Sequence, residues 1–291
     1  MEYSSTQLAT LEIPAPRLTE GRFASITAYT DQALFEACGV RIAFTERMGG
    51  ISDAPYDSLN LGSHVGDKWD SVKKNRQTLL ECFGCDEAPL LVPSQVHGKI
   101  VLTIDSPKAA ATWLAKTEAD SKAKECDAIT VECAGVAAQL NFADCVPVIV
   151  VAPNGDFSVV HAGWRGVENL ISVEALKGLA KDVALKCSMP VSDVIASSNV
   201  YIGPHIMGEC FEISAEIHDR FVSSFGSECD VDPRHIELSA ALKTQLVRVG
   251  VCEERIASLD MCTVCNNDKF FSYRGQGGVC GRHGAFAIRC L

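Results

Sequence analysis

The chain lacks both an excess of positive charge and any long apolar run. It carries 26 lysine and arginine residues against 37 aspartate and glutamate residues, for a formal net charge of −11. This charge repels nucleic-acid phosphates and anionic membrane surfaces. No segment approaches the ~20 apolar residues needed to cross a bilayer, and the first 21 residues lack the basic and apolar regions of a secretory signal. We therefore expect a cytoplasmic protein without nucleic-acid or membrane partners.

Internal repeats and low-complexity tracts are also missing. The 291 residues are 47% hydrophobic and 22% charged, which is typical of a packed globular protein. Residues 1–21, interrupted by Pro14 and Pro16, are predicted to be a weakly ordered lead-in. No linker divides the rest, so residues 22–291 are predicted to form one domain, and the oligomeric state is expected to be a monomer or a small homo-oligomer.

The 14 cysteines are scattered through the chain rather than arranged as a disulfide framework. Most are therefore expected to be reduced core residues. Two Cys-x-x-Cys pairs, Cys82/Cys85 and Cys262/Cys265, could be halves of one structural zinc site. However, 177 residues separate the pairs, far more than the roughly 15 to 20 of a zinc ribbon, which disfavours that site.

Hydrophobic periodicity predicts a mixture of strands and helices. Residues 136–142 and 146–152 are continuously apolar, as central strands are, and Asp70 looks like the N-cap of a helix that runs to about Phe83. Further strands are predicted near 40–46, 99–105, 157–163, 194–202, 255–260 and 283–289, and further helices near 167–185, 214–225 and 239–249. Several connections are too short for crossover helices, so we expect mixed sheets covered by helices.

Three short sequences place metal-binding side chains at predicted strand ends: SQVHG with His97, ADC with Cys145, and HAGWRG with His161. Three protein ligands with a fourth position for water are typical of catalytic zinc, and two imidazoles with one thiolate are a known set. Two alternatives stay open. Cys145 could be a nucleophile activated by either histidine, or each residue could be structural.

These motifs belong to a longer series. The segments TERMGGISDAPYDSLNLGSHVGD, SQVHG, NFADCVPV, HAGWRG, IGPHIMGECFEI and CTVCNNDKFFSYR follow one another from about residue 45 to 274. In that order the chain resembles the YfiH family. This family is also called the multicopper polyphenol oxidoreductase or laccase-domain family, and is described as purine nucleoside phosphorylase.

The resemblance implies Zn²⁺ bound by His97, Cys145 and His161. It also implies an α+β fold, a layered α-β-β-α sandwich with mixed sheets, related to the catalytic domains of cysteine-hydrolase toxins. The implied activities are phosphorolysis of adenosine, inosine, guanosine and methylthioadenosine to base and ribose 1-phosphate, and deamination of adenosine. The implied ligands are thus purine nucleosides and phosphate.

Other residues of the shared motifs can be given roles as hypotheses. Arg47, Arg165 and Arg274 could bind phosphate, or could form structural ion pairs. His64 could hydrogen-bond the ribose or transfer a proton, or could have a capping or packing role. Asp144 could support a zinc ligand or accept a proton, or could simply form a turn, while Trp164 is better explained by core packing than by stacking on a base.

Two other functions compete with the purine reading. Copper is less favoured than zinc because none of the seven histidines forms the His-x-His pairs of multicopper sites, although a His₂Cys set near a methionine can hold one copper for polyphenol oxidation. Hydrolytic editing of peptidoglycan precursors would use the same site. A third alternative is a non-enzymatic protein in which zinc only holds strands together, and such a protein would show no turnover.

Overall fold

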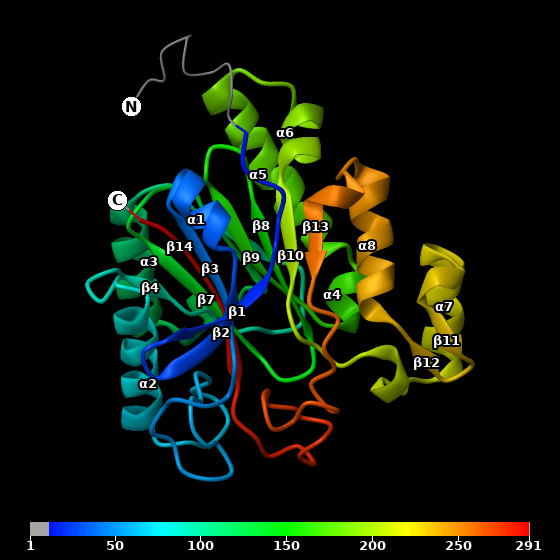
Figure 1. Ribbon diagram of the computed structural model, residues 1–291, viewed down its shortest axis with the longest axis horizontal. Helices are drawn as coiled ribbons and strands as arrows, with labels where there is room; N and C mark the ends of the chain where they lie inside the picture. Colours follow the sequence, from blue (N-terminus) through cyan, green and yellow to red (C-terminus); the bar gives the residue numbers. More distant parts are fainter. Residues whose placement is uncertain (1–11, 291) are drawn as a thin grey trace.

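Two six-stranded mixed sheets form the body of the protein, which the computed structural model describes over residues 12–290 (Figure 1). The first sheet has the order β1-β2-β3-β14-β7-β4, with bounds Thr19–Phe23, Ile26–Thr30, Val40–Thr45, His283–Arg289, Ala137–Phe142 and Leu90–Leu91. The second has the order β13-β10-β8-β9-β6-β5, with bounds Ile256–Ser258, Asn199–Ile202, Val146–Val151, Phe157–Ala162, Ala128–Val131 and Val101–Ile104. Of the strand pairs that the described residues form, the β4–β7, β5–β6 and β10–β13 pairs are parallel and the others are antiparallel.

The side-chain alternation of the central strands builds a layered core. On β8, Val148 faces the helices of the second sheet, while Ile149 faces the first sheet. Helices α4 (Trp164–Glu168), α5 (Ile171–Cys187), α6 (Val191–Ser197), α7 (Ala215–Phe225) and α8 (Leu238–Val249) pack on the second sheet. Helix α2 (Trp69–Cys82) covers the outer face of the first sheet. This arrangement confirms the predicted α-β-β-α sandwich, and each buried aliphatic side chain contributes about 1.5–3 kcal/mol to it.

Short elements close the edges of the sandwich. Helices α1 (Gln32–Cys38) and α3 (Pro107–Ala119) contribute Leu34 and Trp113 to the core between the sheets. Strands β11 (Asp230–Asp232) and β12 (His235–Ile236) form a separate hairpin beside α7. The 3₁₀ turns within residues 12–290 are Ser121–Lys124, Gly208–Cys210, Ser227–Cys229 and Glu253–Arg255. No helix among the described residues has both the length and the apolar character of a membrane span.

Three sequence predictions need correction. The predicted strand at 194–202 is helix α6 in its first half, because Pro190 precedes the helix and Asp193 lies in its first turn. Helix α2 begins at Trp69, so Asp70 is a first-turn residue rather than the N-cap. The predicted long helix begins only at Ile171, because the left-handed Leu170 (φ 61°) separates it from α4.

The predicted lead-in, residues 1–21, lies partly outside the described residues. Within the described part, Ile13 is buried and the carbonyl of Pro14 accepts hydrogen bonds from Asn199 and Arg255. Strand β1 begins at Thr19. Ile13 and Pro14 therefore pack near the start of β10, and residues 19–21 pair with β2.

Candidate metal centre and substrate pocket

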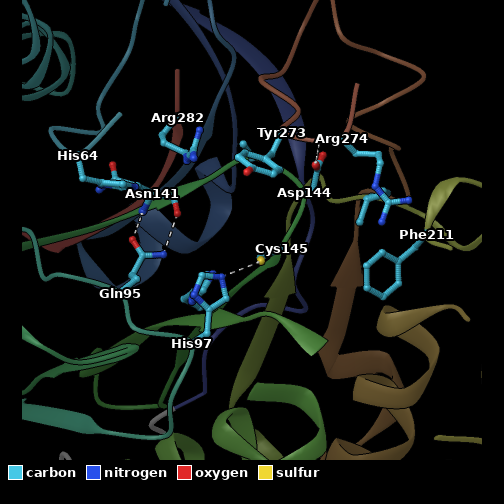
Figure 2. Close-up of a pocket in the computed structure, with 13 residues that line it drawn as sticks. His64, Gln95, His97, Asn141, Asp144, Cys145, Phe211, Tyr273, Arg274 and Arg282 are labelled. Atoms are coloured by element: carbon cyan, nitrogen blue, oxygen red, sulfur yellow. Dashed lines mark hydrogen bonds between the residues drawn. The ribbon is translucent and has the colours of Figure 1, made fainter. Parts of the chain in front are cut away.

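The three predicted metal ligands meet where the chain crosses between the two sheets. Strand β7 ends in the first sheet and β8 begins in the second, and Cys145 is the last residue of the three-residue connection. On β9, His161 pairs with Pro147 of β8. His97 lies in the loop between β4 and β5 with a positive φ of 57°. The ligand atoms of the three residues lie within 4.8 Å of one another, and Cys145 Sγ is 3.8 Å from His97 Nε2 (Figure 2).

A buried carboxylate, Asp127, orients both histidines. Its Oδ1 atom lies 2.9 Å from His161 Nδ1 and accepts a hydrogen bond of 2.9 Å from the backbone N–H of His97. The backbone N–H of Gly98 donates to Oδ2 at 2.7 Å. This bonding leaves His161 Nε2 as the ring nitrogen for a metal, and it fixes the loop that carries His97. Carboxylate–histidine–metal arrangements of this kind raise ligand basicity and hold the ring in place.

The charges of the site favour a deprotonated sulfur. Burial raises the pKa of the Cys145 thiol. The charge and hydrogen bond of His161, together with a hydrogen bond from His97, outweigh burial and lower this pKa to about 6. Burial lowers the pKa of His161, and the Cys145 thiolate and Asp127 overcome that effect and raise it to about 9. The metal-free protein therefore holds a thiolate–imidazolium pair at neutral pH.

These residues fit a metal ion. One soft thiolate and two imidazoles suit zinc or copper, and the free nitrogen of each histidine is available to share one ion with the sulfur. Gly163 adds to this fit because a Cβ atom there would lie 3.1 Å from Cys145 Sγ and 3.2 Å from the His97 ring. An added Cβ atom would therefore crowd both ligands.

The metal centre lies at the floor of a pocket of about 370 Å³ (Figure 2). One wall carries Gln95 and Asn141, and the opposite wall carries Phe211, Tyr273 and Arg274. The remaining lining residues are His64, Ala143, Asp144, Ile206 and Arg282. The pocket thus combines a metal-binding set with two arginines and two aromatic rings.

The Gln95 side chain joins two parts of the pocket. Its amide donates to the Asn141 carbonyl at 2.8 Å and accepts from the Asn141 N–H at 2.8 Å. The Asn141 side-chain oxygen accepts in turn from Gln139. These bonds tie the loop of His97 to the end of β7, so the histidine and the wall keep one relative position.

Asp144 holds in place the wall formed by Phe211, Tyr273 and Arg274, called the aromatic wall below. It has a left-handed backbone (φ 97°), and its carboxylate accepts 2.7 Å hydrogen bonds from the Thr263 and Ser272 hydroxyls and the Arg274 N–H. Among the described residues, the hydrogen bonds of the carboxylate all go to residues 263–274, and none goes to His97 or His161. The Arg274 guanidinium donates to the carbonyls of Cys210 and Glu212. Asp144 therefore positions the loop that carries Tyr273 and Arg274.

His64 and Arg282 occupy the remaining side of the pocket. Arg282 is held by hydrogen bonds to the carbonyls of Cys280 and Gly281, and Gly62 makes room for it, since a Cβ there would lie 2.7 Å from Arg282 Cγ. Partial burial and the charge of Arg282 lower the pKa of His64. His64 is therefore neutral at pH 7 and can both donate and accept a hydrogen bond.

Two of the predicted phosphate-binding arginines do not line this pocket. Arg47 is buried, donates to the carbonyls of Asp57 and Asn267, and lies over the Phe271 ring. Arg165 is exposed and stacks on Trp164, with 4.2 Å from its Cζ atom to the ring centroid. The contacts of Arg47 and Arg165 fit the structural role that the sequence left open for them, and Trp164 packs against the hydrophobic core.

The sequence motifs missed several pocket residues. Asp127 was not singled out, although an acidic residue directly before a fully buried strand is a readable signal. Arg282 follows a glycine-rich loop that offered no pattern. Phe211 and Tyr273 lie within the motifs that carried the resemblance, yet nothing in their spacing distinguished a pocket wall from core.

Comparisons with known proteins identify the family of the chain. The model of the family described as "Multi-copper polyphenol oxidoreductase laccase" matches residues 41–290. The chain is 30% identical over 254 residues to "Purine nucleoside phosphorylase YfiH" of Shigella flexneri, covering 85% of this chain and 93% of the relative. It is also 30% identical over 249 residues to "Adenosine deaminase RL5" of an unknown prokaryotic organism, covering 82% and 90%.

A solved structure shares the fold. The crystal structure of YlmD from Geobacillus stearothermophilus superposes with a TM-score of 0.78 at 26% identity, and the match covers 95% of this chain and 100% of that one. On the strength of the family match and of these relatives, the chain belongs to the laccase-domain family of multi-copper polyphenol oxidoreductases, the family that also contains the YfiH proteins.

Proposed function

We propose that the protein is a zinc-dependent purine nucleoside phosphorylase that also deaminates adenosine. The observation that carries the proposal is one pocket holding a His₂Cys metal set opposite two arginines and two aromatic rings, in a chain whose relatives are named for these two reactions. The substrates are adenosine, inosine, guanosine or methylthioadenosine, with phosphate.

The pocket offers a separate group for each part of the substrates. Phosphate is a dianion, and guanidinium groups hold such oxyanions through paired charge-assisted hydrogen bonds, a role we give to Arg274 and Arg282. The aromatic rings of Phe211 and Tyr273 can pack against the purine. Neutral His64 can hydrogen-bond a ribose hydroxyl.

Phosphorolysis then needs little covalent help from the protein. A phosphate oxygen attacks C1′ of the ribose, the C1′–N9 bond breaks, and the base leaves with that electron pair. A bound zinc lowers the pKa of a coordinated water and polarises oxygen ligands, which also suits replacement of the adenine amino group by water. His97, Cys145 and His161 would hold the ion, and Asp127 would keep both histidines in place.

Purified protein incubated with inosine tests the proposal directly. With phosphate present, hypoxanthine and ribose 1-phosphate should form in equal amounts, and omitting phosphate should stop both. Adenosine without phosphate should release ammonia and yield inosine. Arg220→Gln, which removes a surface arginine of α7 that pairs with Glu168 of α4, is a control and should behave as wild type. Absence of phosphate-dependent product would refute the phosphorylase assignment.

A hydrolase is the second candidate because Cys145, His161 and Asp127 form a nucleophile–base–carboxylate series in the metal-free protein. Such a site could edit peptidoglycan precursors. Hydrolysis of a nucleotide-linked amino sugar peptide by chelator-treated enzyme, stopped by zinc, would favour it over the phosphorylase.

Copper-dependent polyphenol oxidation is the third candidate, raised by the family description. Among the described residues, only one potential ligand group contains histidine, and no methionine lines the pocket. Stoichiometric copper in protein purified without added metal, with dioxygen-dependent phenol oxidation, would replace the zinc assignment.

A further inference from the structure

A second group of metal-binding side chains lies outside the substrate pocket. It comprises Glu209, Cys210, Cys262 and Cys265, whose ligand atoms all lie within 4.8 Å of one another. Cys262 is buried, Cys210 is half-buried, and Cys265 and Glu209 are exposed. The two Cys-x-x-Cys pairs of the sequence thus have different surroundings: Cys262/Cys265 faces Cys210, whereas Cys82 and Cys85 pack beside the outer face of the first sheet.

The spacing of the group matches a tetrahedral thiolate site. Cys210 Sγ and Cys265 Sγ are 3.6 Å apart, and Cys265 Sγ is 4.0 Å from Glu209 Oε1. With zinc–sulfur bonds of about 2.3 Å, two sulfurs of a tetrahedral site lie about 3.8 Å apart. The sulfur pair already has the separation that a shared ion requires, and the Cys-x-x-Cys pair supplies two ligands from one turn.

The backbone holds the two contributing segments together independently of any ion. Residues His205 and Cys262 form a parallel bridge, and Thr263 N–H donates to the His205 carbonyl at 2.9 Å. The Cys262 carbonyl accepts from the backbone and side chain of Asn266. The ligands are therefore preorganised, with Cys262 and Cys265 on one side and the 3₁₀ turn Gly208–Cys210 on the other.

We infer that Glu209, Cys210, Cys262 and Cys265 form a second, structural zinc site. Three sulfur ligands and one carboxylate favour zinc over the hard ions magnesium and calcium, which prefer all-oxygen sets. The exposed Cys265 and Glu209 give the ion a path from solvent. All four positions of a tetrahedral ion are filled by protein, so this site has no open position for catalysis.

The site would brace the aromatic wall of the substrate pocket. Phe211 follows Cys210 directly, and Arg274 donates to the Cys210 carbonyl. From the other segment, the Thr263 hydroxyl bonds Asp144. An ion that joins the two segments therefore fixes the positions of Phe211 and Arg274 without touching a substrate.

Metal analysis of the full-length protein tests this inference separately from the proposed function. In Cys145→Ala, which lacks one ligand of the pocket site, protein purified with zinc and reductant should retain one zinc per chain. Adding Cys210→Ser and Cys265→Ser should remove it. Adding Cys82→Ser and Cys85→Ser instead, which deletes the other Cys-x-x-Cys pair, should leave one zinc in place. No zinc in Cys145→Ala, or one zinc that survives loss of Cys210 and Cys265, would overturn the inference.

Cobalt titration covers the case in which the serine variants do not fold. Co²⁺ added to zinc-stripped Cys145→Ala should give the intense thiolate-to-cobalt absorption of a tetrahedral site, and zinc should abolish it. A cobalt spectrum without thiolate bands contradicts the site. So does an intact mass, measured without reductant, that is lower by two hydrogens and maps to a Cys210–Cys265 disulfide in place of bound metal.

Discussion

Replacing Asp127 by asparagine should weaken zinc binding at the pocket site without changing the size of the side chain. The carboxylate is fully buried and is hydrogen-bonded to His161 Nδ1 and to three backbone N–H groups, those of His97, Gly98 and, at 3.4 Å, Val96. An asparagine has one accepting oxygen and a donating amide. If the oxygen keeps His161 and His97, the amide faces the N–H groups of Gly98 and Val96, and the 2.7 Å bond from Gly98 is the main loss.

The expected cost follows from these contacts. Hydrogen bonds to a charged acceptor contribute about 1.5–3 kcal/mol. Loss of a supporting partner of a metal ligand costs roughly 10–100-fold in affinity, or about 1.4–2.8 kcal/mol, which agrees with one lost bond. If the asparagine turns its amide toward His161 instead, the Nδ1 atom must accept, the proton moves to Nε2, and the loss reaches the upper end of this range.

Competition with a chromophoric chelator measures the zinc affinity of each variant. Asp53→Asn, which removes one partner of an exposed ion pair with Lys68, is the matched control and should bind zinc as the wild type does. Equal zinc affinity in Asp127→Asn and wild type would refute the role given to this carboxylate. A folded far-ultraviolet spectrum in the same sample separates weak binding from unfolding.

Three further predictions concern the same pocket. In metal-free protein the lowered pKa of Cys145 should place the midpoint of its alkylation near pH 6, with the thiolate present above that pH, and zinc should block the alkylation. Peptide mass spectrometry measures the extent of alkylation with and without zinc, and a midpoint near pH 9 would contradict the thiolate–imidazolium pair. Gly163→Ala crowds the ligands and should lower the zinc affinity about fivefold, which corresponds to about 1 kcal/mol of strain. Gly178→Ala, whose added Cβ atom would have no neighbour within 4 Å, should leave the affinity unchanged, and equal affinities of the two variants would show that the ligands move aside. Arg282→Gln should raise the KM for phosphate about 10–100-fold, and Arg165→Gln should leave it unchanged; steady-state kinetics giving the reverse order would restore the sequence-based assignment.

The regular elements with strong apolar patterns were predictable from the sequence. Strands β7, β8 and β9 are buried at every position, and their predicted bounds agree within one residue. Helix α3 was missed, although Ser106 caps its third residue and Pro107 occupies its first turn, which are readable signals. The insertion of β14 between β3 and β7 was not predictable, since it joins the end of the chain to two distant strands.

The pocket residues also differ in how far the sequence predicts them, because some stand in short motifs and others reach the pocket only through long-range packing. His97, Cys145 and His161 stand in short motifs and were identified from them. Asp127 is 30 residues from His97 and 34 from His161. Its carboxylate reaches His161 because β6 pairs with β9 in the register that sets Ala128 opposite Val160, and it lies beside the His97 loop because β6 also pairs with β5. Pairing of that kind depends on the folded sheet, so no local pattern reveals it.

Two buried aspartates, Asp127 and Asp144, fix the two halves of the pocket in the same way, since each carboxylate accepts hydrogen bonds from the residues that form its half. Burying a carboxylate costs several kcal/mol unless hydrogen bonds replace its water. For Asp127, hydrogen bonds from the His97 loop and His161 offset this penalty, and for Asp144, hydrogen bonds from Thr263, Ser272 and Arg274 do so. Each loop therefore loses stability if it moves away from its carboxylate. Because Asp144 directly precedes Cys145, displacement of the aromatic wall also strains the backbone that presents the metal-binding sulfur, so the two halves are expected to respond together to substitution of either aspartate.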